Sequence, residues 1–170
     1  MSDLSKRATQ CLSLADTELH AVHKMGVWLG GLCAPEAFLT AARQEVAQKN
    51  GWSLEDVGMT LRVGDFTNED NHANMFLLRD MGMEGAGWDA ETECLSVSNV
   101  ISSPLPLVTV TWMCLKDLPS AKDGEVMIEL PVYLNHTRSQ LLFTVKLPAS
   151  ESIPVVVWQQ RGACLVAWTQ

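Results

Sequence analysis

The sequence lacks any long apolar run. No stretch of its 170 residues reaches the length of about eighteen apolar residues that a membrane-spanning helix needs. The first residues also lack the apolar core of a signal peptide, because several of them are polar: Ser2, Asp3, Ser5, Lys6 and Arg7. We therefore expect no membrane span, and a protein that stays in the cytosol or nucleus unless a partner carries it elsewhere.

Positive charge is also scarce. The chain has 12 Lys and Arg against 20 Asp and Glu, a net charge of −8, and its basic residues are scattered rather than clustered. Nucleic-acid binding needs a basic face that displaces counterions from phosphates. The composition therefore argues against a nucleic-acid partner, and the acidic excess mainly favours solubility.

Cysteines are few, and their spacing forms no pairs. The five are odd in number, widely separated and without a Cys-x-x-Cys motif: Cys11, Cys33, Cys94, Cys114 and Cys164. This pattern fits neither a disulfide framework nor a zinc site. It predicts free, buried thiols in a reducing compartment.

The short motifs of catalysis and cofactor binding are absent from the sequence. No GxxxxGK[ST] loop is present to hold phosphates, and no GxSxG turn is present to hold a nucleophilic serine. Gly26, Gly30 and Gly31 precede an expected helix, but their spacing differs from the dinucleotide-binding pattern. We expect no catalytic, cofactor-binding or metal-binding residue in this chain, and hence no enzyme activity of its own.

Two groups of histidines and carboxylates are alternatives to that expectation. His20 and His23 lie three residues apart on an expected helix and could share a metal ion, yet no third ligand accompanies them. A solvated or packed pair is favoured. Glu69, Asp70 and His72 could form a carboxylate–histidine site, but the asparagines around them favour a solvated loop.

Helical signals fill the first third of the chain. Apolar residues recur at helical spacing over residues 4–25. Pro35 suits the first turn of a second helix, which Asn50-Gly51 would end. Ser53 with Asp56 resembles a capping box for one further short turn.

After residue 57 the apolar pattern changes to a period of two, which is typical of strands. Close glycines at Gly82, Gly85 and Gly87 predict a tight bend or bulge beside Trp88. Short strands without intervening helices indicate an antiparallel barrel or sandwich. We expect the α+β class: a helical lead-in over 1–57, packed on a roughly six-stranded antiparallel β-barrel over 58–170, together one domain. The expected strands fall at 59–63, 75–81, 107–115, 126–130, 141–147, 155–158 and 163–168.

Tryptophans are expected to divide between the two parts. Trp112, Trp158 and Trp168 fall on expected strands and are predicted to fill the barrel interior. Trp28 and Trp52 flank the second helix and are predicted to clamp the helical part onto the sheet. An exposed aromatic patch would instead mark a partner surface.

Three segments resemble one known family. GVWLGGLCAPEAFLTAARQEVAQKNGWSLEDV (26–57) is similar to the Leu-Gly-Gly-Leu turn, Pro-Glu-Ala helix start and Trp-Ser-Leu-Glu that open the C-terminal domain of dynein heavy chains. LSVSNVISSPLPLVTVTW (95–112) and LPVYLNHTRSQLLFTV (130–145) resemble later segments of that domain, and Arg161-Gly162 near the end is also family-like. The Leu-Pro-Val-Tyr form resembles the cytoplasmic branch rather than the axonemal branch, where Cys-Pro-Val-Tyr is usual.

The resemblance implies a role within a larger machine. The parent would be a minus-end-directed microtubule motor, cytoplasmic and associated with the microtubule cytoskeleton, whose AAA+ ring binds ATP and Mg outside this chain. This domain would pack on one face of that ring as a regulatory and stabilising cap that tunes force or processivity. The parent complex would include dynein intermediate and light chains.

Two other hypotheses stand beside the ring cap. The barrel could be an interaction module that recruits a dynein-associated or cargo protein, since barrel mouths and strand edges are docking surfaces. A free-standing barrel for a small ligand would leave the family-like helical segment unexplained.

Overall fold

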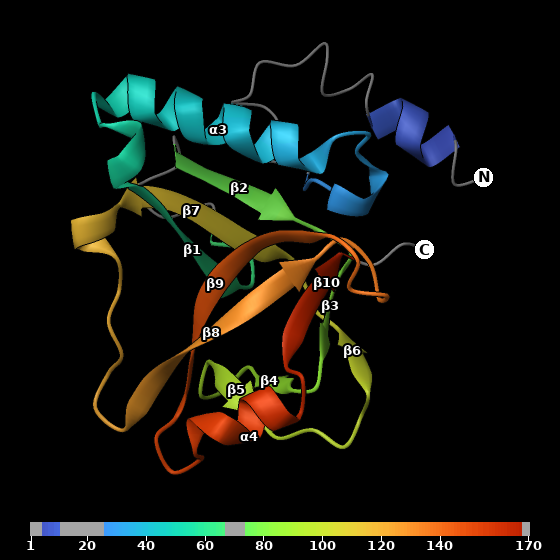
Figure 1. Cartoon of the computed structure of the whole chain (residues 1–170), viewed down its shortest axis with the longest axis vertical. Coiled ribbons are helices and arrows are strands. Elements are labelled where there is room, and N and C mark those ends of the chain that lie inside the picture. Colours follow the sequence, from blue (N-terminus) through green and yellow to red (C-terminus); the bar gives the residue numbers. More distant parts are fainter. Residues whose placement is uncertain (1–4, 11–25, 67–73, 168–170) are drawn as a thin grey trace.

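The computed structural model describes residues 5–10, 26–66 and 74–167. Residues 5–10 are helical, within the helix expected over 4–25, and the remainder of that expected helix lies outside the described residues. Figure 1 shows helix α3 across one end of the strands and the short helix α4 at the other end. The α+β class is confirmed. No helix among the described residues is both long and apolar enough to cross a membrane.

Helix α3 (Pro35–Asn50) begins and ends where the sequence predicted. Pro35 stands in the first turn, where its missing N–H removes no hydrogen bond from the helix. Gly51 ends the helix in the left-handed region, with φ of 65°. On the buried side, Phe38 meets Phe76 edge to face, with 5.8 Å between the ring centroids. The helix is therefore fixed to the strand that carries Phe76.

That strand belongs to a three-stranded antiparallel sheet in the order β1-β7-β2, which lies next to α3. Its strands are β1 (Val57–Val63), β2 (Met75–Leu78) and β7 (Val108–Cys114). Trp112 of β7 is buried and stacks on Phe76, with 6.3 Å between ring centroids. Its burial is as predicted, but Trp112 lies in the sheet next to α3 rather than in the interior of the barrel.

A second sheet of seven strands, in the order β4-β5-β9-β8-β10-β3-β6, curls into a nearly closed barrel (Figure 1). Strand β10 pairs with β8 in parallel, and β5 pairs with β9 in parallel, so this sheet is mixed rather than wholly antiparallel. The strands are β3 (Met81–Glu84), β4 (Gly87–Asp89), β5 (Cys94–Ser96), β6 (Ser102–Pro104), β8 (Glu125–Tyr133), β9 (Leu141–Ser150) and β10 (Cys164–Ala167).

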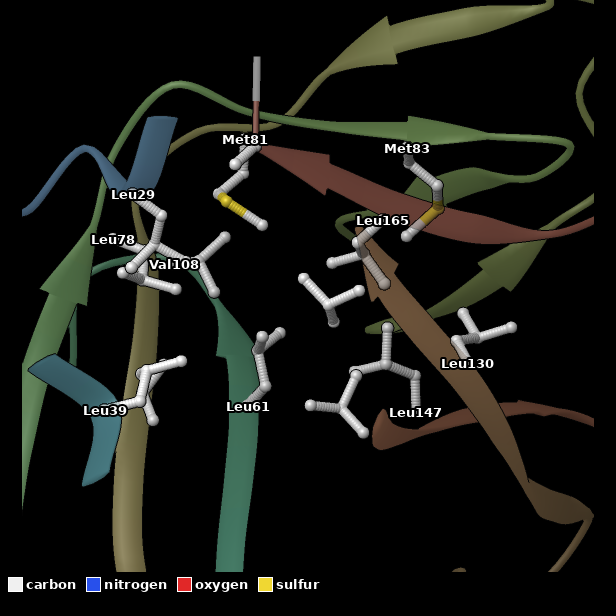
Figure 2. Close-up of a cluster of buried hydrophobic side chains, with 14 of the residues drawn as sticks. Leu29, Leu39, Leu61, Leu78, Met81, Met83, Val108, Leu130, Leu147 and Leu165 are labelled. Carbon is white, nitrogen blue, oxygen red and sulfur yellow. The ribbon is translucent and has the colours of Figure 1, made fainter. Parts of the chain in front are cut away.

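The hydrophobic core lies between the two sheets and under α3. Figure 2 shows Leu61 of β1 and Leu147 of β9 pointing into the space between the sheets. Leu29 and Leu78 lie toward the helical end, and Leu165 lies on the barrel side (Figure 2). All five are buried, at most 4% exposed. One continuous core therefore joins the helical part to the barrel.

Two strand predictions are wrong. Residues 155–158 form the start of helix α4 (Val155–Gln160) rather than a strand. In this helix Trp158 is 1% exposed, while Val155 and Val156 are about half exposed. The helix connects β9 to β10, and burial of Trp158 in this connection outweighs the preference of valine for strands. The segment 75–81 divides into β2 and the start of β3, which belong to different sheets, because Asp80 turns the backbone with φ of 57°.

The turn after α3 and the tryptophans at the helical end were also predicted from the sequence. The turn after α3 exists as η2 (Leu54–Asp56), but the Asp56 N–H bonds to the Ser53 carbonyl and the turn has no side-chain cap, so the capping box is wrong. Trp28 is 2% exposed, and Trp52 packs partly buried against the core, as expected of clamps. Trp168 lies outside the described residues.

Candidate interaction surface

The sequence contains two candidate metal-binding groups. In residues 5–10, 26–66 and 74–167, no three His, Cys, Asp or Glu side chains are placed to hold a metal ion. His20 with His23, and Glu69 and Asp70 with His72, lie outside these ranges. Both alternatives therefore stay predictions.

Arg161 joins three segments at one corner of the barrel. Its Nε donates to the Gly85 carbonyl at 2.9 Å, and its Nη2 donates to the Ser98 carbonyl. Gly85 has φ of 71° in the predicted bend between β3 and β4, and a Cβ there would lie 2.4 Å from the Arg161 carbonyl oxygen. Only glycine fits this contact, so the β3–β4 turn, the segment after β5 and the end of α4 are fixed together.

Beside this corner, the Glu84 carboxylate lies within hydrogen-bonding distance of two side chains from the turn between β8 and β9. His136 Nδ1 lies 2.5 Å from one carboxylate oxygen, and Arg138 Nη2 lies 3.1 Å from the other. Burial alone would raise the pKa of Glu84, but the hydrogen bonds and charge of His136 and Arg138 outweigh burial and hold that pKa below its ordinary value. Glu84 is therefore an ion-pair acceptor rather than a proton donor near neutral pH.

Cys164 also lies close to this carboxylate. Its thiol Sγ is 3.9 Å from a Glu84 oxygen, and the residue is fully buried. Burial raises the pKa of the Cys164 thiol to about 11, so the thiolate needed for nucleophilic attack is scarce at neutral pH. Cys164 and Cys94 are free, buried thiols, as the sequence predicted. The prediction of burial is wrong for Cys33, which is exposed, and for Cys114, which is only partly buried, and Cys11 lies outside the described residues.

An apolar surface lies exposed next to the Arg161 corner. Val97, Val100 and Ile101, which we call the β5–β6 surface, are 50%, 59% and 87% exposed. The Ser98 carbonyl within this segment is held by Arg161. These side chains are therefore presented to solvent on an anchored segment.

Comparison with known proteins decides the family. Residues 1–167 match the model of the C-terminal domain of the dynein heavy chain. The protein belongs to this family. It is 36% identical over 169 residues to the cytoplasmic dynein heavy chain of Dictyostelium discoideum, an alignment that covers 99% of this chain and 3% of that protein.

Other relatives place this dynein domain nearer the cytoplasmic branch. The cytoplasmic dynein heavy chain of Drosophila melanogaster is 32% identical over 174 residues, covering 99% of this chain and 4% of that protein. The ciliary dynein beta chain of Tripneustes gratilla is 29% identical over 147 residues, covering 82% and 3% respectively. The sequence thus spans only a few percent of the relatives that it matches.

The family-like turn at the start of the dynein domain holds the N-terminal helical segment. The Gln10 amide donates to the Trp28 carbonyl at 2.8 Å and accepts from the Trp28 N–H at 3.0 Å. Arg79 reaches the same amide oxygen at 3.2 Å and the Gly26 carbonyl at 3.1 Å. A Cβ on Gly31 would lie 2.4 Å from the Trp28 ring, so the Gly-Gly pair makes room for that ring.

The dynein domain also has a groove of about 380 Å³, whose lining includes the core residues Leu61 and Val145. Strand β1 lies along one side of it. Residues Thr144–Lys146 of β9 and alternate residues of β8 line another side, and the segment after β7 lies beside them. Sequence reasoning missed this groove and the Arg161 corner. The family-like Arg138 and Arg161-Gly162 were the available signal for the corner, but nothing in the sequence paired them with Glu84 and Gly85.

Proposed function

We propose that this domain is a non-catalytic regulatory and structural cap on the AAA+ ring of a cytoplasmic dynein heavy chain. The parent is a minus-end-directed microtubule motor, cytoplasmic and microtubule-associated, assembled with intermediate and light chains. ATP and Mg bind to ring modules outside this chain. The domain, with 1–57 as helical lead-in and 58–170 as barrel, tunes the force or processivity of that motor.

The exposed β5–β6 surface carries this proposal. Ile101 is 87% exposed in a domain whose other large apolar residues are mostly buried. It belongs to the segment 95–112 that resembles the dynein family, so a family-like apolar residue lies on the surface rather than in the core. Exposed apolar residues that neighbour one another mark interaction sites, and the ring of the same heavy chain is the surface that a cap must contact.

Anchoring of this surface supports a mechanical role. Arg161 bonds to the backbone carbonyls of both Gly85 and Ser98, and the core continues from the barrel to α3. A displacement applied at the β5–β6 surface would therefore move the domain as one body. Such a cap changes how the ring moves without taking part in hydrolysis.

The test uses a heavy chain that contains this domain, with Val100→Ser and Ile101→Ser introduced together. We expect ATP hydrolysis to continue while run length or stall force changes, because full burial of one such side chain contributes about 1.5–3 kcal/mol. Leu54→Ser is the matched control, since Leu54 is a 42% exposed leucine on η2. Unchanged motility of the double variant, or complete loss of hydrolysis in a folded motor lacking the domain, would contradict the cap.

A second candidate function is an interaction module that recruits a dynein-associated or cargo protein. The groove beside β1 favours it, because its lining is mainly apolar and includes no residue of the β5–β6 surface.

A further inference from the structure

The groove beside β1 has an apolar lining below its rim, which we call the floor. Among the described residues that line the groove, most of those that are buried or half-buried are apolar: Met59, Leu61, Val63, Phe66, Trp88, Leu118, Met127, Val145 and Pro148. They come from β1, β4, β8, β9 and the segments after β1 and β7, so parts of the chain that are distant in sequence build one lining. Burial of apolar surface contributes about 25 cal/mol per Å², and a ligand that covers the floor gains this free energy.

Charged side chains lie mainly at the rim of the groove. Five of the six charged residues in the described lining are exposed: Arg62, Glu93, Lys122, Glu129 and Lys146. The sixth, Glu125, is half-buried, and its carboxylate accepts the Lys122 backbone N–H at 3.3 Å and lies 3.7 Å from the Cys94 thiol. Below the rim, the described lining therefore contains one carboxylate, which already has two donors.

Several of the rim charges also interact with groups of the protein. The Arg62 guanidinium lies over the Phe66 ring, 3.5 Å from its centroid, where the ring face attracts a cation. Glu129 and Lys146 are directly opposite one another in the β8–β9 register, and opposite charges in such a cross-strand pair stabilise each other. An ionised ligand group would lose its water on the apolar floor, and this desolvation is costly without an opposite charge to pair with. The lining therefore favours an uncharged ligand.

The size of the groove fits a small molecule. Its volume of about 380 Å³ lies within the range of roughly 300–1,000 Å³ for small-molecule sites, near the lower end. Long ladders hold the strands around it, because β1 pairs with β7 along its whole length and β8 pairs with β9 from Glu125 to Tyr133. The groove is therefore formed before a ligand binds, which keeps the entropic cost of binding low.

We propose that the groove is a binding site for a small, uncharged and largely apolar molecule. This site is independent of the ring cap, and its occupant differs from the protein that the second candidate function would recruit. Met59 and Met127 line the groove and adjust to the shape of a ligand, because the methionine side chain is unbranched and flexible. Trp88 adds an aromatic surface to the same lining.

The test uses the 170-residue protein with isotope-labelled methionine methyl groups, observed by NMR, and three probes: 1-octanol, octylammonium and octanoate. The probes share one alkyl chain length and differ in charge. We expect 1-octanol to shift the methyl resonances of Met59 and Met127 saturably. The resonances of Met81 and Met83, which are buried outside this lining, should change little. Octylammonium and octanoate should bind at least tenfold more weakly than 1-octanol.

Three single variants locate the binding site. Met127→Lys and Leu118→Lys each place a charge on the floor, and Val97→Lys is the control because Val97 is a half-exposed apolar residue outside the groove. Followed at Met59, the affinity for 1-octanol should fall more than tenfold on either groove variant and stay within twofold on the control. Unchanged resonances of the two core methionines show that each variant is folded.

Three outcomes would overturn the proposal. They are equal affinity for all three probes, equal 1-octanol affinity of the groove and control variants, and no saturable shift at the two groove methionines. The last outcome would leave the groove to the recruitment of a protein. None of these outcomes bears on the motility test of the ring cap.

Discussion

Gly85 is the position where a single added carbon should damage the dynein domain most clearly. Its φ of 71° lies in the left-handed region, and a Cβ would be 2.4 Å from the Arg161 carbonyl oxygen and 2.9 Å from the Ala163 nitrogen. Both neighbours are backbone atoms, so neither can rotate away. The Gly85→Ala variant must therefore separate the β3–β4 turn from the end of α4, together with the bond from Arg161 Nε to the Gly85 carbonyl.

The expected loss of stability follows from three terms. Left-handed backbone costs alanine about 1–2 kcal/mol relative to glycine. Lower entropy of the unfolded state returns about 0.4–1 kcal/mol. Overpacking against fixed backbone adds about 1–3 kcal/mol. Together they predict that Gly85→Ala lowers the free energy of unfolding by about 1–4.5 kcal/mol.

Gly124 provides a matched control for the backbone term. Its φ is 82°, and no atom lies within 4 Å of the position that a Cβ would take. Gly124→Ala therefore has the backbone cost without the clash, and we expect a loss of about 1 kcal/mol or less. The difference between the two variants isolates the contact between Gly85 and the end of α4.

Urea unfolding of the 170-residue protein, followed by tryptophan fluorescence, measures both losses from the shift in midpoint at constant m value. In a thermal scan the extra clash should lower Tm by about 2–4 °C per kcal/mol for a domain of this size. If the two variants differ by less than about 0.5 kcal/mol, Gly85 does not pack against the α4 end as described, and the anchoring of the β5–β6 surface loses its support.

Three further predictions concern polar and ionisable groups. Gln10→Ala removes the side-chain amide that bonds to the buried Trp28 N–H and carbonyl, and should cost about 1–3 kcal/mol; unchanged amide exchange at Trp28 would contradict this. Because the folded pKa of Glu84 is lowered, its carboxylate stabilises the fold at neutral pH, and this contribution disappears as pH falls through the folded pKa. Glu84→Gln should therefore be less stable near pH 7 and show a shallower stability loss in acid, and equal pH slopes would refute the ion-pair role. With its pKa raised to about 11, buried Cys164 should react with iodoacetamide much more slowly than exposed Cys33, as mass spectrometry can show; similar rates would count against that burial.

Local signals were sufficient where a segment determines its own conformation. Pro35 and Asn50-Gly51 bound α3 because the first-turn proline and the left-handed glycine act within one turn of the helix. The period-two pattern located β1 because its alternate residues face the core, Val57 and Leu61 among them. In these places the residue type and the secondary structure depend on the same local interactions.

Contacts between residues distant in sequence determine helix α4 and the groove. Residues 155–158 have strong strand preference, yet burial of Trp158 in the barrel end makes them helical. The groove requires β1 and alternate residues of β8 to meet, and their residues are more than 60 positions apart. No periodicity within either strand predicts that these residues lie close together.

The family-like segments that were recognised separately meet at the Arg161 corner, and this explains why they have a recognisable form. Ser98 lies in the segment 95–112, Arg138 lies in the segment 130–145, and Arg161-Gly162 lies near the end of the sequence. Arg161 bonds to the Ser98 carbonyl, and a Cβ on Gly162 would lie 3.0 Å from Arg138 Nη1. Arg161 donates to backbone carbonyls, which every residue type has. The corner therefore limits the residue type at the arginine and glycine positions more than at Ser98, whose carbonyl only accepts. The Arg-Gly pair and the Asn-x-Thr-Arg turn can be read in the sequence, while the exposed surface of Val97, Val100 and Ile101 beside them becomes apparent only in the folded structure.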